Sequence, residues 1–530
     1  MKITFVSPTP LDVSAFGVRS LSAFLKQEGI NVRNIFLSGG VEKYRYRKDY
    51  LYRYDKKLID EVIDLCKGSD LVGISLMTNY FERAIQITSE IKFATNLPVI
   101  WGGIHPTVMP EECIKYSDMI CIGEGEDALL ELIRNMEGGR NYTDVRNIWF
   151  KKDGNIIRNQ LRPLEENLDR FPFYDFGLDE HYIYDISKKC ISPMTKELLE
   201  MSFPLEPHLE GTFSDAYKRT RSYKTMTTRG CPHRCTFCAE RTLSELYAGQ
   251  RYLRKRSISH VINELQWVKK ELPFVESIFL FDDTFLIRST SEIIEFSKNY
   301  KEKINLPFHI QASPATLTEE KMESLTDAGL VFVEMGIQST SKIGRELYHR
   351  NVSNEKLLEA ANILSKYRDK IYTPCYHVIL DNPWEKTEDV LETLNLLLKF
   401  PRPFWLKRAS LVCFPGTELF VKAKEDGFLK TEDDMRKEIY SKHLHQPKGS
   451  YVNLLIYLIG FPHFPRWIVR LLSKKFLVRL FDRTALGTLY FNLNKMGDGL
   501  IILSKGVRSI LKGDFRRVYR YFIRFFSKMS

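Results

Sequence analysis

Three cysteines lie within eight residues, and no other feature constrains the folding of this sequence as strongly. Cys231, Cys235 and Cys238 stand in the string Arg-Gly-Cys-Pro-His-Arg-Cys-Thr-Phe-Cys, which begins at Arg229. Three thiolates at this spacing can wrap one small iron-sulfur cluster. Because such clusters are normally held by four thiolates, a four-iron cluster in this loop keeps one iron open for a ligand that carries both an amine and a carboxylate.

A zinc knuckle is the alternative interpretation of this loop, with His233 or a distant residue as the fourth ligand. Zinc sites usually pair their ligands as two doublets, and the sequence contains no second doublet. The other cysteines are scattered and do not form the dense pattern of a disulfide scaffold, which indicates a reducing, cytosolic environment. They are Cys66, Cys113, Cys121, Cys190, Cys375 and Cys413.

The cysteine spacing, with the aromatic Phe237 just before the third cysteine, resembles the signature of the radical S-adenosylmethionine (radical SAM) superfamily. The resemblance implies a [4Fe-4S] cluster that passes one electron to the sulfonium of S-adenosylmethionine, cleaving it to methionine and a 5'-deoxyadenosyl radical. It implies that Cys231, Cys235 and Cys238 are both metal ligands and catalytic residues, and that Phe237 contacts the cofactor. It also implies an electron donor such as flavodoxin or ferredoxin.

The first 140 residues alternate short apolar runs with helical patterns, which predicts an α/β domain with a parallel, doubly wound, Rossmann-like sheet. The expected strands are 3–7, 32–37, 71–76 and 99–101, and the expected helices are 18–28 and 81–94. Ligands of such sheets lie against loops at the carboxyl ends of the strands. Here these loops are rich in small residues, which let a large planar ligand approach the backbone.

Together these loops resemble the cobalamin-binding domain that precedes the radical core in one large branch of the superfamily, the class B radical SAM methyltransferases. The resemblance covers most of residues 1–135 and implies cobalamin as a third cofactor. His105 lacks the Asp-x-His-x-x-Gly pattern of a cobalt ligand, so we expect it to contact a backbone group or the corrin edge. The implied cobalamin contacts are Ser75, Gly102, Gly103, His105, Gly123, Glu124, Gly125 and Glu126.

Residues 141–222 are expected to connect two domains and to include a β-hairpin around Asp153-Gly154, where glycine supplies a positive φ angle. From 223 to 430, strand and helix patterns alternate at intervals suited to a partial, TIM-like (β/α)6 barrel, the radical SAM core. The expected strands are 225–228, 277–281, 308–312, 332–337, 376–380 and 406–412. The cysteine loop follows the first of them.

Polar residues concentrate at the carboxyl ends of these strands, where the active sites of barrels lie. By resemblance, Asp282 and Asp283 occupy the motif that receives the amino group of S-adenosylmethionine, and the sequence does not rank the two. The segment around Gln338 and Ser339 resembles the one that contacts the ribose or carboxylate, and Arg350 is a candidate partner for that carboxylate. Gln311 and Ser313 complete the expected cofactor contacts.

The last hundred residues, 431–530, are expected to form a basic, apolar, mainly helical region that the resemblance does not cover. From 466 onward there are 15 Lys and Arg against 3 Asp, whereas the preceding part is almost neutral. The apolar run 451–460 is too short to span a membrane and fits a buried or interfacial helix. Segments 467–481 and 507–526 fit three readings: core packing of a basic domain, a lipid headgroup layer or, least favoured, nucleic acid.

The sequence therefore predicts a cobalamin-dependent radical SAM enzyme that methylates an unactivated carbon of a small-molecule or lipid substrate. Two alternatives remain open. One is a radical SAM enzyme that uses cobalamin differently, for ring formation or rearrangement of a lipid, tetrapyrrole or natural product. The other is an RNA-modifying protein whose basic tail binds nucleic acid. We expect the protein to lie in the cytoplasm. The basic, apolar tail leaves open a peripheral contact with the inner face of the membrane.

Overall fold

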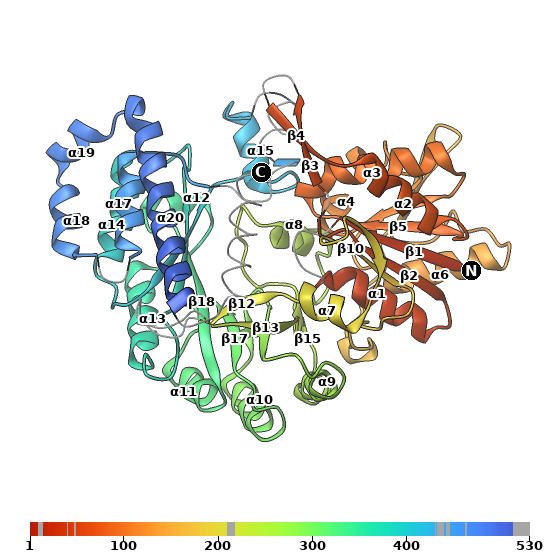
Figure 1. The fold of residues 1–530 in the computed structure, drawn as a ribbon, viewed down its shortest axis with the longest axis horizontal. Helices are drawn as coiled ribbons and strands as arrows, with labels where there is room; N and C mark the ends of the chain where they lie inside the picture. The colour runs from red at the N-terminus through yellow and green to blue at the C-terminus, as the bar shows by residue number, and fades with distance from the viewer. Residues whose placement is uncertain are drawn as a thin grey trace. The chain divides into compact units, whose positions relative to one another are not determined.

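The computed structural model describes residues 1–8, 14–39, 41–46, 49–208, 218–429, 431, 439–440, 446–461 and 464–511. The chain forms two compact units (Figure 1). Unit 1 comprises Met1–Pro204, Thr228–Glu264 and Val412–His443; unit 2 comprises Leu205–Thr227, Leu265–Leu411 and Leu444–Ser530. The cysteine loop thus lies in the same unit as the N-terminal residues.

Unit 1 is built on a nine-stranded sheet in the order β11-β10-β2-β1-β5-β6-β7-β8-β9. The five central strands are parallel, so the expected parallel sheet is confirmed. They are β1 (Lys2–Ser7), β2 (Asn31–Phe36), β5 (Leu71–Ser75), β6 (Val99–Gly102) and β7 (Met119–Cys121).

Helices cover both faces of this sheet, which makes it doubly wound. The apolar sides of α1 (Phe16–Gln27) and α6 (Glu126–Glu137) share one core with one sheet face, through residues such as Val18 and Leu132. Those of α2 (Lys56–Cys66) and α3 (Phe81–Ala94) pack into a second core on the other face, where Val62 and Ile87 are fully buried. The apolar spacing of three and four residues along each helix produces this one-sided burial.

Residues 141–204 extend the sheet of unit 1 at both edges. The hairpin around Asp153-Gly154 joins β8 (Ile148–Lys152) to β9 (Asn155–Arg158), and both turn residues have the positive φ angles that such a turn needs. Strand β8 pairs antiparallel with β7. At the opposite edge, β10 (His181–Asp185) pairs with β2, and β11 (Cys190–Pro193) pairs with β10.

Unit 2 contains the expected partial barrel. Its sheet has the order β12-β13-β16-β17-β18-β19-β20, and all neighbours from β13 onward are parallel. Strand β12 (Leu205–His208) pairs antiparallel with β13. The parallel strands are β13 (Lys218–Thr225), β16 (Ser277–Leu280), β17 (Phe308–Ala312), β18 (Leu330–Gln338), β19 (Cys375–Leu380) and β20 (Trp405–Ser410).

The first parallel strand of unit 2 is not where the sequence predicted it. Residues 218–225 form β13, whereas we expected 225–228. The sequence of β13 resembles a polar loop because it contains several Lys and Arg residues. Two of its charged residues have acidic partners: Lys224 pairs with Glu206 of β12, and Arg221 lies 3.7 Å from Glu276. Tyr223 of this strand is fully buried.

Helices follow the strands of unit 2 on the outside of the curled sheet (Figure 1). The connection after β16 contains α10 (Thr290–Lys303), whose first turn is stabilised by a capping box between Ser289 and Glu292. The later connections contain α11 (Glu319–Asp327), α12 (Lys342–Leu347), α13 (Asn354–Lys366) and α14 (Thr387–Leu397).

The C-terminal region is helical, as expected. The apolar run at 451–460 forms α17 (Tyr451–Ile459), a buried helix that packs against α14. It is followed by α18 (Arg466–Leu472), α19 (Lys475–Phe481) and α20 (Gly487–Leu511). The expected tail helix 467–481 is thus split into α18 and α19, and residues 512–526 of the second expected segment lie outside the described residues. Among the helices that the structure describes, none is both long and apolar enough to cross a membrane.

Candidate functional site

The cysteine loop lies between the two-residue strand β14 (Thr228–Arg229) and helix α8 (Ala239–Leu246). Cys235 is buried, whereas Cys231 and Cys238 are partly exposed, and all three are thiols rather than disulfides. The loop turns tightly at its end, where the amide of Cys238 donates to the carbonyl of Cys235 over 3.1 Å. Three thiols presented by one short loop fit the donor set of an iron-sulfur cluster with one open iron.

The base of this loop is held by buried ion pairs within unit 1. Arg229 Nη2 lies 2.6 Å from Glu126 Oε1, and Arg229 Nη1 lies 3.3 Å from Glu124 Oε2. Arg254 makes a second contact with Glu124, at 2.5 Å. Burial opposes the ionisation of Glu126, but the charge of Arg229 together with the hydrogen bonds from Arg229, Ser20 and the backbone outweighs burial and lowers the pKa of this carboxyl. The two glutamates expected to contact cobalamin are therefore bound to arginines that flank the cysteine loop.

Gly123, which precedes these glutamates, must be glycine for a steric reason. Its φ is +77°, and a Cβ atom at this position would come within 1.8 Å of the hydroxyl oxygen of Tyr247. Tyr247 follows α8, and burial raises its pKa to about 12, so the hydroxyl stays neutral. The segment after the cysteine loop thus packs directly on the loop that follows β7.

The segment that follows β20 also packs on the cysteine loop within unit 1. The amide of Leu419 donates to the carbonyl of Thr236 over 3.0 Å, and Thr242 Oγ1 donates to the carbonyl of Gly416 over 2.6 Å. Gly416 has a φ of +80°, and a Cβ there would lie 2.5 Å from Val108 Cβ. Two segments remote in sequence thus close around the cysteine loop.

His105 lies on the short helix α4 (Ile104–Val108) and is fully buried. Its ring packs against Phe81, at a centroid distance of 4.7 Å, and against Tyr440 at 5.6 Å. Neither ring nitrogen has a hydrogen-bond partner among the described residues, although Nε2 lies 3.9 Å from Glu112 Oε2. Burial lowers its pKa to about 4, so the ring is neutral. A neutral, enclosed ring is consistent with packing rather than with charge-based binding.

The other small residues of the expected cobalamin loops differ in what surrounds them. Gly103 has a φ of +98°, and a Cβ there would come within 2.8 Å of the Leu76 carbonyl and 3.2 Å of Ser75 Oγ. A Cβ on Gly125 would touch Leu21 at 3.4 Å, whereas one on Gly102 would meet no heavy atom closer than 3.9 Å. Protein packing therefore explains Gly103, and Gly102 is the glycine that leaves space beside the backbone. This small-residue edge fits a large planar ligand such as cobalamin.

The structure places the two aspartates of unit 2 in different surroundings. Asp282 is fully buried, and its carboxylate accepts hydrogen bonds from the amide and the hydroxyl of Thr227 at 2.6 and 3.0 Å. Asp283 is exposed. Although part of Asp283 reaches the solvent, the protein around its carboxyl group reduces the hydration of that group, and this effect, followed by the charge of Asp282, raises its pKa to about 6. Asp283 is thus the carboxylate that is accessible to an ammonium group.

Most of the remaining expected SAM contacts lie at the carboxyl ends of β17 and β18, and Arg350 follows helix α12. Gln338 has a φ of +69° at a register shift between β18 and β19, and Arg350 Nη2 donates to the carbonyl of Gly336 over 2.8 Å. Ser339 Oγ donates to Glu385 Oε1 over 2.6 Å. Gln311 is half-buried, and Ser313 is buried. Gln338 and Arg350 meet at Gly336, where an added Cβ would lie within 3.5 Å of both.

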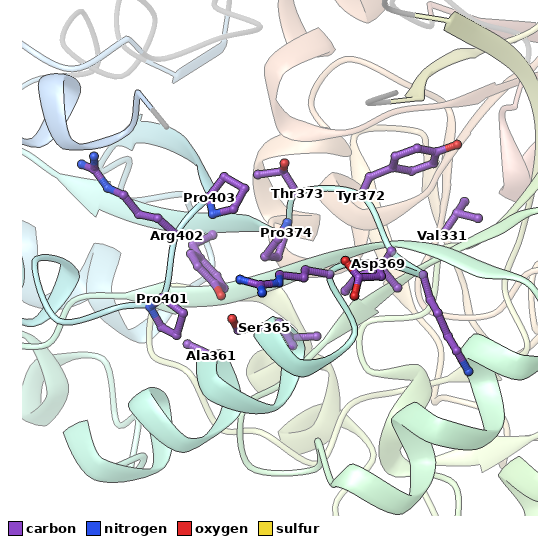
Figure 2. Close-up of a pocket in the computed structure, with 15 residues that line it drawn as sticks. Val331, Ala361, Ser365, Asp369, Tyr372, Thr373, Pro374, Pro401, Arg402 and Pro403 are labelled. Carbon is purple, nitrogen blue, oxygen red and sulfur yellow. The ribbon is translucent and has the colours of Figure 1, made fainter. Parts of the chain in front are cut away.

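A cavity of about 540 Å³ lies elsewhere in unit 2 (Figure 2). Figure 2 shows Thr373, Pro374, Arg402 and Pro403 around it, all just before β19 or β20. It therefore opens at the amino-terminal edge of the sheet, whereas barrel enzymes react substrates at the carboxyl-terminal edge. We assign the cavity no part in the reaction.

Sequence reasoning missed the residues that support the site. Arg229 and Arg254 flank the cysteine loop, Tyr247 packs on Gly123, and Glu385 accepts from Ser339. Arg229 stands next to the cysteine string, but nothing in the sequence signals its partner Glu126, which lies about a hundred residues earlier. These contacts depend on tertiary packing.

Comparison with protein families is consistent with this geometry. Residues 225–397 match the radical SAM superfamily, and residues 4–133 match the B12 binding domain. The chain therefore belongs to the radical SAM enzymes that carry a B12-binding domain. The cofactors that these domains imply are a [4Fe-4S] cluster, S-adenosylmethionine and cobalamin.

Curated relatives carry different named activities. An uncharacterized methyltransferase of Pyrococcus horikoshii is 25% identical over 68% of this chain and 71% of its own length. Cytidylyl-2-hydroxyethylphosphonate methyltransferase of Streptomyces wedmorensis is 23% identical over 82% of both chains. Anaerobic magnesium-protoporphyrin IX monomethyl ester cyclase of Rubrivivax gelatinosus is 24% identical over 66% of this chain and 58% of its own. The chain is therefore a methyltransferase-like enzyme whose exact reaction the relatives leave open.

Solved structures share the fold. The radical S-adenosylmethionine methyltransferase TsrM of Kitasatospora setae superposes with a TM-score of 0.60 at 17% identity, over 80% of this chain and 76% of TsrM. The cobalamin-dependent S-adenosylmethionine radical enzyme OxsB superposes with a TM-score of 0.62 at 15% identity, over 100% of this chain and 84% of OxsB. At these identities the likeness shows the fold alone.

Proposed function

We propose that this enzyme methylates an unactivated carbon of its substrate, using a cluster held by Cys231, Cys235 and Cys238 and a cobalamin bound at the carboxyl edge of the unit 1 sheet. The bound cofactors supply reductive cleavage of S-adenosylmethionine to a 5'-deoxyadenosyl radical, and a methyl group carried by cobalamin. One S-adenosylmethionine is consumed in each of these two roles. The electron comes from a donor such as flavodoxin or ferredoxin.

One observation carries this proposal: the cysteine loop belongs to the same compact unit as the B12-type sheet and is tied to it by buried ion pairs. Arg229, directly before the loop, pairs with Glu126 directly after the Gly123 turn. A carbon radical takes up a methyl group only where the two sources are held together, so an enzyme for this reaction needs both sites on one rigid support.

The residues of unit 2 take the cofactor-binding roles in this proposal. Asp283 receives the amino group of S-adenosylmethionine, while Asp282 holds the loop in place through Thr227. Gln338 and Arg350, which meet at Gly336, bind the ribose and the carboxylate. Ser313 and Gln311 complete the edge.

A reconstitution experiment tests the proposal. The chain is purified without oxygen, and its iron, sulfide and corrinoid contents are measured together with 5'-deoxyadenosine formation after reduction. We expect about four irons per chain and one corrinoid, and cleavage of S-adenosylmethionine that Cys235→Ala abolishes. Cys190→Ala, at a partly exposed cysteine outside the loop, is the matched control and is expected to keep both. A wild-type protein that cleaves nothing with an intact cluster contradicts the proposal.

Ring formation is the second candidate reaction, because a relative named as an anaerobic cyclase matches two thirds of this chain. Product mass separates the two candidates. A gain of one methylene in the product supports methylation, and an unchanged carbon count with loss of hydrogen supports ring formation.

We further propose that the substrate is a lipid, which the enzyme binds at a membrane surface. Helices α18 and α19 expose large apolar side chains, with Trp467 66% and Phe476 63% exposed, and Arg470, Lys474 and Lys475 stand among them. Apolar residues interleaved with cations suit the headgroup layer of an anionic bilayer.

Sedimentation with anionic phosphatidylglycerol vesicles tests the membrane contact. We expect the wild type to sediment and the Trp467→Ala/Phe476→Ala double variant to stay in solution. Phe93→Ala, which removes a 91% exposed aromatic on α3, is the control and is expected to sediment. Binding to RNA instead of vesicles, in a gel-shift assay that weakens with salt, supports the nucleic-acid alternative and excludes this part of the proposal.

A further inference from the structure

A cluster of metal-ligand side chains lies on neighbouring strands of unit 2. Glu334 on β18 is the direct register partner of Cys375 on β19, and His377 follows two residues later on the same face of β19. Lys407 on β20 is the register partner of His377. Val333 and Met335, which alternate with Glu334 along β18, are fully buried apolar residues. The cluster therefore lies on the face opposite this apolar packing, the face that also carries Gly336.

The distances within this cluster suit one metal ion. One ligand atom each from Glu334, Cys375 and His377 lie within 4.8 Å of one another. Glu334 Oε2 is 3.4 Å from His377 Nε2. Oxygen and nitrogen ligands bound to zinc at 2.0–2.1 Å lie about 3.4 Å apart at a tetrahedral angle. The pair is thus spaced as zinc ligands are.

We propose that Glu334, Cys375 and His377 form a zinc site on the interior face of the partial barrel. A thiolate, an imidazole and a carboxylate are together the donors that Zn²⁺ accepts, and tetrahedral zinc with three protein ligands keeps a fourth position for water or a substrate atom. Strand pairing fixes the backbone of all three ligands, so little ordering is needed on binding.

The charges around the cluster are compatible with a cation. Glu334 brings a carboxylate to the cluster, and His377 and Lys407 lie beside its two oxygens. Lys407 Nζ lies 3.7 Å from the other oxygen, Oε1, so it pairs with Glu334 without occupying Oε2. A cysteine ligates zinc as the thiolate, so zinc would take the place of the Cys375 proton.

This site goes beyond the radical reaction, because it adds a Lewis acid that the cluster and cobalamin do not supply. The open position of the zinc faces the side of the sheet that carries Gly336, which Arg350 and Gln338 adjoin. A substrate oxygen or nitrogen is the group that zinc would hold there. The metal would therefore act on substrate binding and orientation.

Metal analysis of the anaerobically purified enzyme tests the site without measuring activity. We expect about one zinc per chain in the wild type and at least a fivefold lower content in Cys375→Ser and His377→Gln. Iron content and 5'-deoxyadenosine formation, measured on the same samples, report whether each variant is folded and whether the radical chemistry stands. Cys190→Ser, which changes a partly exposed cysteine of unit 1, is the control and is expected to keep its zinc.

X-ray absorption at the zinc edge identifies the ligands. We expect one sulfur at about 2.3 Å together with nitrogen or oxygen ligands, and the loss of that sulfur in any zinc retained by Cys375→Ser. Three sulfur ligands would instead place the zinc in the cysteine loop and overturn the proposal. A wild type without zinc, or equal zinc in all variants, would show that the cluster is an ion-pair network and overturns it as well.

Discussion

Replacing Glu126 by glutamine tests whether the buried ion pair with Arg229 stabilises unit 1. Glu126 Oε1 lies 2.6 Å from Arg229 Nη2, and the glutamate side chain is only 6% exposed. Removing one partner of a buried pair typically costs 3–5 kcal/mol because the other charge stays buried. Arg229 is itself 27% exposed and keeps Glu124 at 3.3 Å, so we expect at most the lower end, about 3 kcal/mol.

Urea unfolding followed by circular dichroism measures this loss. With an m value of about 3 kcal/mol/M, the midpoint of Glu126→Gln falls by about 1 M. Glu111→Gln is the control, because it also removes a glutamate that pairs with an arginine, Arg158, but on the exposed surface. Exposed pairs contribute little, so this midpoint is expected to stay unchanged. Equal midpoints for the two variants would refute the reasoning.

The pH dependence of the same difference provides a second check. The folded state lowers the pKa of Glu126, so the unfolded chain binds more protons wherever the two states differ. The stability that this carboxylate contributes is therefore present above its unfolded pKa of about 4.3 and is lost as the pH falls through the lower, folded value. Wild type and Glu126→Gln should become equally stable in acid.

Three further outcomes follow from single contacts. Gly123→Ala is expected to lose more than about 1 kcal/mol, because the new Cβ meets the Tyr247 hydroxyl in a left-handed conformation, and thermal melting shows the loss; unchanged melting contradicts the steric argument. Burial lowers the pKa of His105 to about 4, so the stability of the wild type is expected to fall more steeply than that of His105→Phe between pH 6.5 and 4 in urea titrations. Asp283→Asn is expected to weaken S-adenosylmethionine binding by about 10-fold to 100-fold in calorimetry. The affinity of the wild type is expected to decrease when the pH falls below the Asp283 pKa of about 6. An unchanged affinity of the variant would indicate that Asp282 binds the amino group instead.

Local patterns were sufficient to predict most of the fold. The strands and helices of the parallel sheets follow from the spacing of apolar residues, which is a property of each segment alone. The prediction was wrong at strand β13, because its charged residues Lys224 and Arg221 pair with Glu206 and Glu276 from other segments. A strand rich in charged residues resembles a loop in the sequence, because the acidic residues that pair with it lie in other segments.

The candidate site divides in the same way. Some parts of the site are short motifs of neighbouring residues: the cysteine spacing, the two adjacent aspartates and the small residues after the strands. The class of reaction could therefore be predicted from the resemblance of these motifs to known families. Which aspartate remains accessible could not, because the hydrogen bonds from Thr227 to Asp282 connect residues 55 positions apart. The role of Gly123 depends in the same way on Tyr247.

The sequence by itself therefore determined the cysteine loop and the order of the strands and helices, since cysteine spacing and apolar periodicity act over a few residues, and the resemblance of these motifs to known families implied the three cofactors. Only the tertiary structure decided that the cysteine loop belongs to the unit of the B12-type sheet, through Arg229 and Glu126. It alone brought Glu334, Cys375 and His377 together. The physical reason is that ion pairs and ligand sets depend on distances of a few ångströms, which strand pairing and burial create between residues remote in the chain.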